Sequence, residues 1–508
     1  MTRSIMVLGT GSSVGKSIIT AGLCRVFKND GYKVAPFKSQ NMALNSFITK
    51  DGFEMGRAQV VQAEAAKIEP SVLMNPILLK PTSEKKSQVI INGKVYQDMN
   101  AKDYHVFKVE LRHIIKKAYD TLSGQNDIVV LEGAGSPAEI NLKENDIVNM
   151  GMAKISNSPC LLVSDIDKGG VFASILGTIM LLEPEEKARV KGLIINKFRG
   201  DIEILKPGLV QIEELTGIAV VGVMPYFNLK IEDEDSLSDK FSMYKESNDF
   251  DVDILIVKLP YISNFTDFNS LENIIGVRVR YCWDAKEFGE PDLIIIPGSK
   301  NTIHDLMFLR NSGLEGVIVE KSKRGTPVLG VCAGMQILGK TIRDPLGCES
   351  SVKEIGGRGL LDIDTVFEKD KTTIQTKAFV KSDDEIILDA MDRMSIEGYE
   401  IHMGSTTYGE DSLPFVMRED GETIGVSNKE GKIYGTYLHG IFDNGVFCDA
   451  LIQGLKKKKG LAYQNFQKNI DFKDFKETQY EKLDELMRAN IDISAIYSIM
   501  GIEQAREE

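Results

Sequence analysis

The sequence predicts an α/β protein made of two successive α/β units and a helical tail, and three observations lead to this fold class. Short apolar runs alternate with helical patterns, which is typical of parallel sheets covered by helices. A glycine-rich loop joins the first predicted strand to the first helix, and a cysteine stands at a second strand-to-helix turn, at position 332. We expect three parts, at residues 1–245, 251–455 and 456–508.

Composition and charge limit the class of protein. The 508 residues are 43% hydrophobic and 27% charged, which is ordinary for a globular protein of two or three domains. The formal net charge of −13 argues against nucleic acid or an anionic membrane as the main partner. No apolar run is long enough to span a bilayer, and the chain enters its first strand without a signal peptide. The six cysteines follow no metal or disulfide spacing, so we expect a cytoplasmic protein.

The first predicted strand, residues 4–9, runs into a glycine-rich loop and then into a helix over 18–28. Backbone N–H groups of such a loop bind phosphates, its lysine reaches the terminal phosphates, and its hydroxyl binds Mg²⁺. The strict P-loop pattern has a glycine where this chain has Thr10, with Gly9 one position earlier. We expect a nucleotide to contact Thr10, Gly11, Ser12, Ser13, Val14, Gly15, Lys16 and Ser17.

Further predicted strands complete a doubly wound, mostly parallel first sheet. Such sheets bind ligands beyond the carboxyl ends of their strands, and polar, glycine-bearing loops follow these ends here. The strands are expected at 33–37, 127–132, 160–165, 191–196 and 219–223, with a helix such as 171–183 between them. A polyanionic substrate would need a basic pocket, and the candidates near the loop ends are Lys38, Lys80, Lys168, Lys197 and Arg199.

The second half repeats the α/β pattern after an acidic linker or exposed loop at 228–250. We expect strands at 252–258, 277–281, 292–296 and 326–331, and a strand-rich stretch over 360–435. The four lysines at 456–459 predict a solvated helix end, and the tail at 476–505 has helical periodicity.

Cys332 lies in the pattern Gly-x-Cys-x-Gly, directly after an apolar strand and before a helix. Small residues on both sides permit the sharp turn of a nucleophile elbow, with a thiol in place of a serine hydroxyl. The helix N-terminus favours the thiolate, which can attack a carbonyl group. The alternative is a buried core cysteine, the usual environment of a free thiol.

A cysteine nucleophile needs a base, and the chain has five histidines. His439 stands at a predicted strand end followed by glycine, which suits a residue that projects into a site. His402 lies in a similar strand, whereas His105 and His113 fall in a helical stretch and are expected to be structural. The N–H groups of Gly298 and Ala333 are expected to form an oxyanion hole.

Three motifs of the second half resemble class I glutamine amidotransferases. They are Pro-Gly-Ser at 297–299, Gly-Val-Cys-Ala-Gly-Met-Gln at 330–336 and Leu-His-Gly at 438–440. The resemblance implies a flavodoxin-like fold in which Cys332 forms a γ-glutamyl thioester, His439 is the base and ammonia is released. Most members have a glutamate two residues after the histidine, where this chain has Ile441. The third residue is therefore missing or comes from elsewhere, with Glu400 as one candidate.

The phosphate loop and residues 130–135 resemble dethiobiotin-synthetase-like ATPases, which phosphorylate a carboxylate for attack by a nitrogen nucleophile. The resemblance implies ATP as cofactor and a Mg²⁺ held by Ser17 and Glu132. Glu54 is a third possible metal ligand, or else an acid at a helix N-terminus. Asn196 stands where the family contacts adenine.

The whole chain resembles the cobyric acid synthase family of the cobalamin pathway, on motifs that run from residue 9 to residue 443. The resemblance implies amidation of the b, d, e and g carboxylates of adenosylcobyrinic acid a,c-diamide, with one ATP and one glutamine per cycle. Three alternatives stay open. They are the sister family that makes the a,c-diamide, a MinD-like regulatory ATPase with a degenerate glutaminase, and an inactive scaffold.

Overall fold

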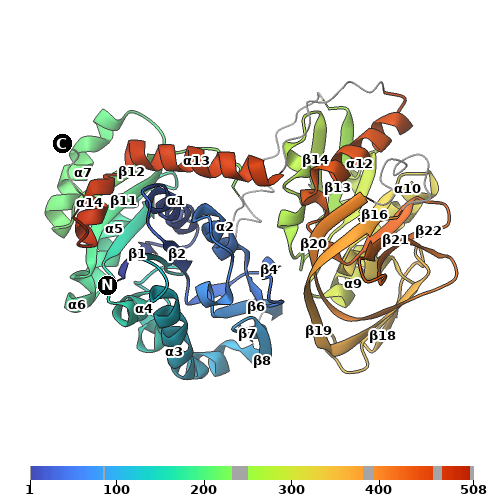
Figure 1. The fold of residues 1–508 in the computed structure, drawn as a ribbon, viewed down its shortest axis with the longest axis horizontal. Coiled ribbons are helices and arrows are strands. Elements are labelled where there is room, and N and C mark those ends of the chain that lie inside the picture. The colour runs from blue at the N-terminus through green and yellow to red at the C-terminus, as the bar shows by residue number, and fades with distance from the viewer. Residues whose placement is uncertain (1, 84–85, 232–249, 382–393, 462–471, 504–508) are drawn as a thin grey trace. The chain divides into compact units, whose positions relative to one another are not determined.

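The computed structural model describes residues 2–83, 86–231, 250–381, 394–461 and 472–503 (Figure 1). It divides into two units. Unit 1 consists of Met1–Ala43, Glu54–Ser236 and Lys476–Glu508, and unit 2 consists of Leu44–Phe53 and Leu237–Phe475. This division differs from the sequence-based boundaries, because Leu44–Phe53 joins the second unit and the predicted tail at 456–508 is divided between the units, with Lys476–Glu508 in the first. Most of the linker predicted at 228–250 lies outside the described residues.

The main sheet of unit 1 is fully parallel, as predicted, with six strands in the order β12-β11-β10-β1-β9-β2. The central strand β1 is fully buried over Ile5–Leu8, which fits a strand covered on both faces. The strands are β1 (Arg3–Gly9), β2 (Val34–Phe37), β9 (Ile128–Glu132), β10 (Cys160–Asp165), β11 (Val190–Phe198) and β12 (Val220–Pro225).

Helices cover this sheet, and the last two of them come from the far end of the sequence. In Figure 1 the red helices α13 and α14 lie beside the blue helix α1, and Leu483, Met487 and Tyr497 share one hydrophobic core with α1. The tail predicted as a separate part therefore completes unit 1. Its helices are α1 (Lys16–Asn29), α2 (Arg57–Ala65), α3 (Ala101–Ser123), α4 (Met150–Ser156), α5 (Val171–Leu181), α6 (Pro184–Lys187), α7 (Ile202–Thr216), α13 (Phe472–Asn490) and α14 (Ile493–Ile499), with 3-10 turns at η1 (Val72–Met74) and η2 (Ile140–Asn145).

Unit 1 also has a small four-stranded sheet, in the order β3-β6-β7-β8, that the sequence patterns did not predict. Asn92 and Gly93 both have positive φ in the turn between β7 and β8, which is typical of the tight turn of a β-hairpin. The strands are β3 (Gln40–Met42), β6 (Ile77–Ser83), β7 (Lys86–Ile91) and β8 (Lys94–Asn100), and the separate strand β5 (Glu54–Gly56) precedes α2.

Unit 2 has one large sheet whose first five strands, in the order β14-β13-β15-β16-β23, are parallel, as in a flavodoxin-like fold. Beyond β23 the sheet continues through antiparallel pairing with β22, β21 and β19. The long strand β19 also pairs with β20 in antiparallel and with β17 in parallel orientation. The strands are β13 (Val252–Val257), β14 (Val277–Cys282), β15 (Leu293–Ile296), β16 (Val328–Val331), β17 (Thr341–Arg343), β18 (Glu354–Gly356), β19 (Ile363–Val380), β20 (Met394–Tyr408), β21 (Ser412–Arg418), β22 (Thr423–Asn428), β23 (Ile433–Thr436) and β24 (Leu438–His439), and β4 (Ser46–Ile48) also belongs to this unit.

The helices of unit 2 are short, and their apolar faces pack on the parallel strands in one core. They are α9 (Thr302–Asn311), α10 (Leu314–Lys323), α11 (Ala333–Leu338) and α12 (Gly445–Lys458), with 3-10 turns at η3 (Phe265–Phe268), η4 (Leu271–Asn273), η5 (Ala285–Glu287) and η7 (Ile441–Asp443). The prediction of a fully solvated lysine end at 456–459 was wrong for Lys456, because that side chain is buried and lies 2.7 Å from Asp251. Within the described ranges, no helix is long and apolar enough to cross a membrane.

Candidate active sites

Cys332 stands at a strained turn between β16 and α11. Its backbone has φ 53° and ψ −112°, an unusual conformation for a residue with a side chain. A Cβ on Gly334 would lie 1.9 Å from the carbonyl oxygen of Ile296, and a Cβ on Gly330 would lie 2.5 Å from the backbone of Gly334. Both glycines are therefore required for the chain to turn this tightly, and the predicted elbow geometry is present.

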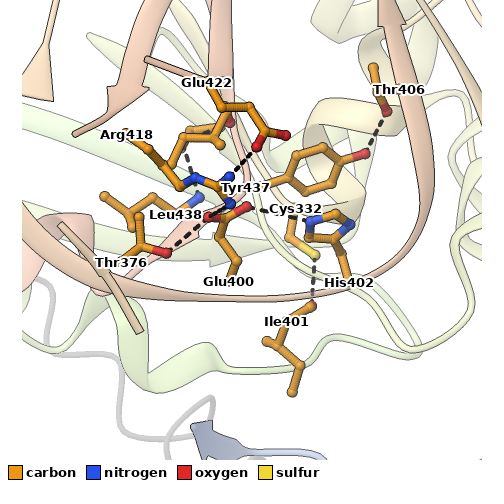
Figure 2. Close-up of polar contacts among 12 residues, drawn as sticks. Cys332, Thr376, Glu400, Ile401, His402, Thr406, Arg418, Glu422, Tyr437 and Leu438 are labelled. Atoms are coloured by element: carbon orange, nitrogen blue, oxygen red, sulfur yellow. Dashed lines mark hydrogen bonds and ion pairs between the residues drawn. The ribbon is translucent and has the colours of Figure 1, made fainter. Parts of the chain in front are cut away.

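The elbow places the Cys332 sulfur among backbone and aromatic groups. The backbone N–H of Cys332 donates to the carbonyl oxygen of Thr436 at 2.7 Å. The sulfur of Cys332 lies 3.5 Å from the carbonyl oxygen of Ile401 (Figure 2). The ring of His402 stacks on Tyr437 with 3.7 Å between centroids. His402 thus belongs to the wall of the cysteine site.

His439 is fully buried at the end of β24, close to the predicted oxyanion loop. A Cβ on Gly298 would lie 3.3 Å from His439 Cε1, so the backbone of Gly298 packs directly against the imidazole. Ala333 is the first residue of α11, immediately after Cys332, the predicted nucleophile. The structure therefore brings Cys332, His439, Gly298 and Ala333 into one region of unit 2.

Asp267, which sequence reasoning missed, is the carboxylate partner of His439. His439 Nδ1 donates to Asp267 Oδ2 at 2.7 Å, and both side chains are buried. Burial opposes the imidazolium, but the Asp267 carboxylate and the Cys332 sulfur outweigh that effect and raise the pKa of His439 to about 10. The imidazole is therefore held as the cation, with its Nδ1 side fixed.

Glu400 does not occupy this position. It accepts a hydrogen bond from Thr376 at 2.9 Å and lies 3.6 Å from both His402 and Arg418. Figure 2 shows Glu400 surrounded by these three side chains. Burial would raise its pKa, but the contacts with His402, Thr376 and Arg418 lower it overall. The candidate role of Glu400 as orienter of His439 was therefore wrong, and its contacts help hold the wall formed by His402.

We expect Asp267→Asn to lower glutamine hydrolysis by about 10²- to 10⁴-fold in kcat, because the imidazole loses its anionic partner. Removing the carboxylate also lowers the pKa of His439, so the imidazolium loses its proton at lower pH. The alkaline limb of the glutaminase pH profile should move down by about one to three pH units. Glu400→Gln should leave that limb in place, and an equal shift in both variants would contradict the assignment of Asp267.

The predicted phosphate loop of unit 1 has two residues in left-handed backbone conformations, one of them a glycine. Ser13 and Gly15 have φ of 58° and 99°, and the Nζ of Lys16 donates to the carbonyl oxygens of Gly11 at 2.8 Å and Gly135 at 3.2 Å. Thr10, which replaces the usual glycine, shares a hydrogen bond with Ser164 at 2.9 Å. The loop is thus bonded to the sheet through Thr10, and the Lys16 ammonium group connects it to the turn at Gly135.

Asn196, the predicted adenine contact, closes one side of this loop. Its amide nitrogen donates to the carbonyl oxygen of Val14 at 2.9 Å, and a Cβ on Gly15 would lie 2.0 Å from the same nitrogen. Its buried Oδ1 accepts no hydrogen bond from any residue that the structure describes. An acceptor without a partner is costly when buried, and an amino group of a bound base would satisfy it.

Glu132 lies at the centre of the predicted metal site. Its carboxylate accepts from Ser17 at 2.8 Å and from Gln62 at 2.5 Å, and Lys38 lies 3.0 Å away. The hydroxyl of Ser17 and the carboxylate of Glu132 are oxygen donors of the kind that Mg²⁺ prefers. Glu54 instead pairs with Lys80 at 2.8 Å.

These residues fit the way proteins hold Mg²⁺. That ion usually takes only one or two protein oxygens and fills its other positions with phosphate and water. Across the part of the chain that the structure describes, no group of three or more His, Cys, Asp or Glu residues forms a metal cage. The pair of Ser17 and Glu132 is therefore suited to an ion that arrives with a nucleotide.

Most of the predicted basic residues are paired with carboxylates. Lys38 and Lys80 are buried in the pairs described above. Lys197 lies 2.9 Å from Asp165, Arg199 lies 3.0 Å from Asp167, and Lys168 is exposed in the same loop region. The loop ends therefore carry charges of both signs, and a purely basic pocket does not form there.

Family models match both units. Residues 5–236 match the CobQ/CobB/MinD/ParA nucleotide binding domain, and residues 253–447 match the CobB/CobQ-like glutamine amidotransferase domain. The phosphate loop in the first and the Cys332–His439 pair in the second agree with these descriptions. The fold and the two sites thus define an ATP-dependent glutamine amidotransferase.

Curated relatives narrow the class further. The chain is 51% identical to cobyric acid synthase of Thermoanaerobacter sp. (strain X514) over 98% of this chain and 99% of that protein. It is 53% identical to cobyric acid synthase of Alkaliphilus metalliredigens (strain QYMF) over 97% of this chain and 99% of that protein. The chain belongs to the cobyric acid synthase family.

Solved structures add little to this assignment. The structure of PurLQS from Thermotoga maritima matches 41% of this chain and 99% of that chain, with 18% identity and a TM-score of 0.32. The fold assignment therefore depends on the strand order and on the family models.

Proposed function

We propose that this chain amidates the b, d, e and g carboxylates of adenosylcobyrinic acid a,c-diamide, using ATP and glutamine-derived ammonia. The observation that supports the proposal is the presence of a candidate site for each half-reaction in one chain. Unit 1 has a phosphate loop in which Lys16 donates to Gly11 and Ser17 donates to Glu132. Unit 2 has the buried residues Cys332, His439 and Asp267. The names of the curated relatives support the corrinoid substrate.

In the glutaminase half-reaction, the Cys332 sulfur attacks the side-chain amide carbon of glutamine. The N–H groups of Gly298 and Ala333 are proposed to stabilise the oxyanion that forms. The imidazolium of His439 gives its proton to the leaving ammonia, and Asp267 holds the ring in place. The neutral imidazole then takes a proton from water, which cleaves the thioester and releases glutamate.

In the synthetase half-reaction, a corrinoid carboxylate oxygen attacks the γ-phosphorus of ATP and ADP leaves. We propose that residues Thr10–Ser17 bind the phosphates and that Lys16 neutralises the γ-phosphoryl oxygens. Asn196 is proposed to contact the adenine through its unpartnered oxygen. Ammonia then attacks the acyl phosphate carbon, phosphate leaves and the amide remains.

The same unit is proposed to hold Mg²⁺ through Ser17 and Glu132. Such an ion stabilises charge on the β- and γ-phosphoryl oxygens when it is bound. Glu54 stays a candidate third ligand, and its ion pair with Lys80 would have to open first. Lys38 lies 3.0 Å from Glu132, so this ion pair would also have to adjust when Mg²⁺ and nucleotide bind.

The proposed substrate is tested by mass spectrometry of adenosylcobyrinic acid a,c-diamide after incubation with the protein, ATP, Mg²⁺ and glutamine. We expect four successive acid-to-amide conversions, each accompanied by one ADP and one glutamate. Conversion of cobyrinic acid with no change in the a,c-diamide would assign the chain to the sister activity. ATP hydrolysis with no product from either corrinoid would favour the regulatory ATPase.

A further inference from the structure

The glutaminase unit contains ten residues, Leu44–Phe53, that come from the nucleotide-binding half of the sequence. In the chain this segment lies between β3 (Gln40–Met42) and β5 (Glu54–Gly56), two strands of unit 1. Its strand β4 and its turn nevertheless pack within unit 2. The segment therefore gives unit 2 contacts that a chain beginning at the second α/β unit would lack.

Asn45 and Ser46 make a reciprocal pair of hydrogen bonds with the start of η3. The N–H of Ser46 donates to Asn264 Oδ1 at 3.0 Å, and the N–H of Phe265 donates to Asn45 Oδ1 at 3.1 Å. Asn45, Ser46 and Asn264 are each 2% exposed or less. Because neither N–H can reach water at this depth, the two bonds fix the position of the turn.

The fixed turn carries the groups that orient His439. Asn264 has φ 53°, and its backbone oxygen accepts from the N–H of Asp267 at 3.0 Å. Asp267 Oδ2 holds His439 Nδ1 at 2.7 Å, and the amide nitrogen of Asn264 lies 3.4 Å from the same ring atom. A shift of Asn45 would thus be transmitted to the base through a single turn of 3-10 helix.

A second connection runs through Tyr399 on β20. The hydroxyl of Tyr399 donates to the carbonyl oxygen of Ser46 at 3.2 Å, and Phe47 packs edge-on against its ring at 5.6 Å. The Tyr399 ring also stacks on the imidazole of His439, with 5.3 Å between centroids and 14° between planes. The Nδ1 atom of His439 is therefore held by Asp267, on the turn bonded to Asn45 and Ser46. One face of the imidazole is held by Tyr399, which is bonded to Ser46.

The rest of the segment is anchored to β19, so its position is not set by these bonds alone. The side-chain amide of Gln375 donates to the carbonyl oxygen of Ile48, and Thr373 Oγ1 donates to that of Gly52 at 2.8 Å. Ile48 is fully buried and packs with Ile401, the residue whose carbonyl oxygen contacts the nucleophile. The segment therefore meets the Cys332 wall as well as the His439 turn.

We propose that Asn45 and Ser46 are positioning residues of the glutaminase, which act on His439 through Asn264–Asp267 and through Tyr399. The proposal builds on the glutaminase half of the proposed function. It makes glutamine hydrolysis depend on a segment that both enters from and returns to the nucleotide-binding unit.

The test is Asn45→Ala in the full chain, read as glutamate release from glutamine. We expect kcat to fall by about 10- to 100-fold with little change in KM, because a misplaced base slows the chemistry more than substrate binding. The alkaline limb of the pH profile should move to lower pH, since the Asp267 contact loosens. Asn45→Asp keeps the accepting oxygen and should recover part of the rate. Asp51→Ala, exposed at the turn of the same segment and outside these contacts, is the matched control.

Tyr399→Phe decides the matter if Asn45→Ala does not fold, because it keeps the stacked ring and removes only the bond to Ser46. We expect a smaller fall in kcat, again with KM retained. The proposal would be overturned by a folded Asn45→Ala protein with wild-type kcat and an unchanged pH profile. If Asn45→Ala does not fold, the same result in Tyr399→Phe would overturn it. Glutamate release is measured with glutamine alone, without corrinoid, so a failure of the proposed corrinoid amidation would leave this result readable.

Discussion

Cys332→Ala should abolish glutamine-dependent amidation, by at least about 10⁴-fold, while amidation with free ammonia continues. The strained backbone at φ 53° places the Cys332 sulfur at the elbow, and the Cys332→Ala variant removes that sulfur. Unit 1 makes its acyl phosphate without the thiol, so ammonia added to the solution can still react. The two nitrogen sources are compared by counting amide products per ADP formed.

The matched control is Cys348→Ala, which removes another, partly exposed thiol of unit 2. It should keep both activities. If a folded Cys332→Ala protein loses synthesis with both ammonia and glutamine, the assignment of the two half-reactions to separate sites is contradicted. Retained glutamine use would assign the nucleophile to another residue.

Lys16→Ala should remove synthesis with either nitrogen source, by about 10²- to 10³-fold or more, because the γ-phosphoryl group loses its charge partner. Lys16 Nζ already bridges the carbonyl oxygens of Gly11 and Gly135, so its ammonium group is held beside the loop before nucleotide arrives. Glutamate release from glutamine should continue, because Cys332 and His439 are intact. The measurement is ADP formation together with amide product, at saturating ATP.

Lys33→Ala, an exposed lysine of the same unit, is the control for loss of a positive charge. It should leave product formation unchanged. Synthesis that survives in Lys16→Ala at more than a tenth of the wild-type rate would mean that the phosphate loop does not activate the carboxylate. A fall in glutaminase of the same size would mean instead that the two half-reactions are tightly coupled.

Much of the fold could be predicted because each parallel strand is a short, local apolar run. The predicted strand at 4–9 agrees with β1 at Arg3–Gly9, and that at 127–132 agrees with β9 at Ile128–Glu132. The small sheet β3-β6-β7-β8 was missed although β6 and β7 contain apolar runs and an Asn-Gly turn joins β7 to β8. Its other two strands give weak patterns, because β3 has only three residues and β8 is mostly exposed.

The candidate sites could be predicted where the functional residues are adjacent in the sequence. The phosphate loop and the Gly-x-Cys-x-Gly elbow are local, and their glycines are required by contacts as close as 1.9 Å. Asp267 was missed because it lies 172 residues from His439, on a 3-10 turn with no pattern of its own. Asn45 lies 220 residues from Phe265, so its role follows only from the packed structure.

The return of α13 to unit 1 has a consequence for synthesis on the ribosome. Arg25 on α1 is fully buried, and its partners Glu477 and Glu481 follow the whole glutaminase unit in sequence. Leu483 and Met487 are also fully buried, with Met487 against Gly22 of α1. The ribosome therefore synthesises all of unit 2 before α13 can pack against α1. Until then Arg25 lacks its partners Glu477 and Glu481, so unit 1 is synthesised first but completes its folding last.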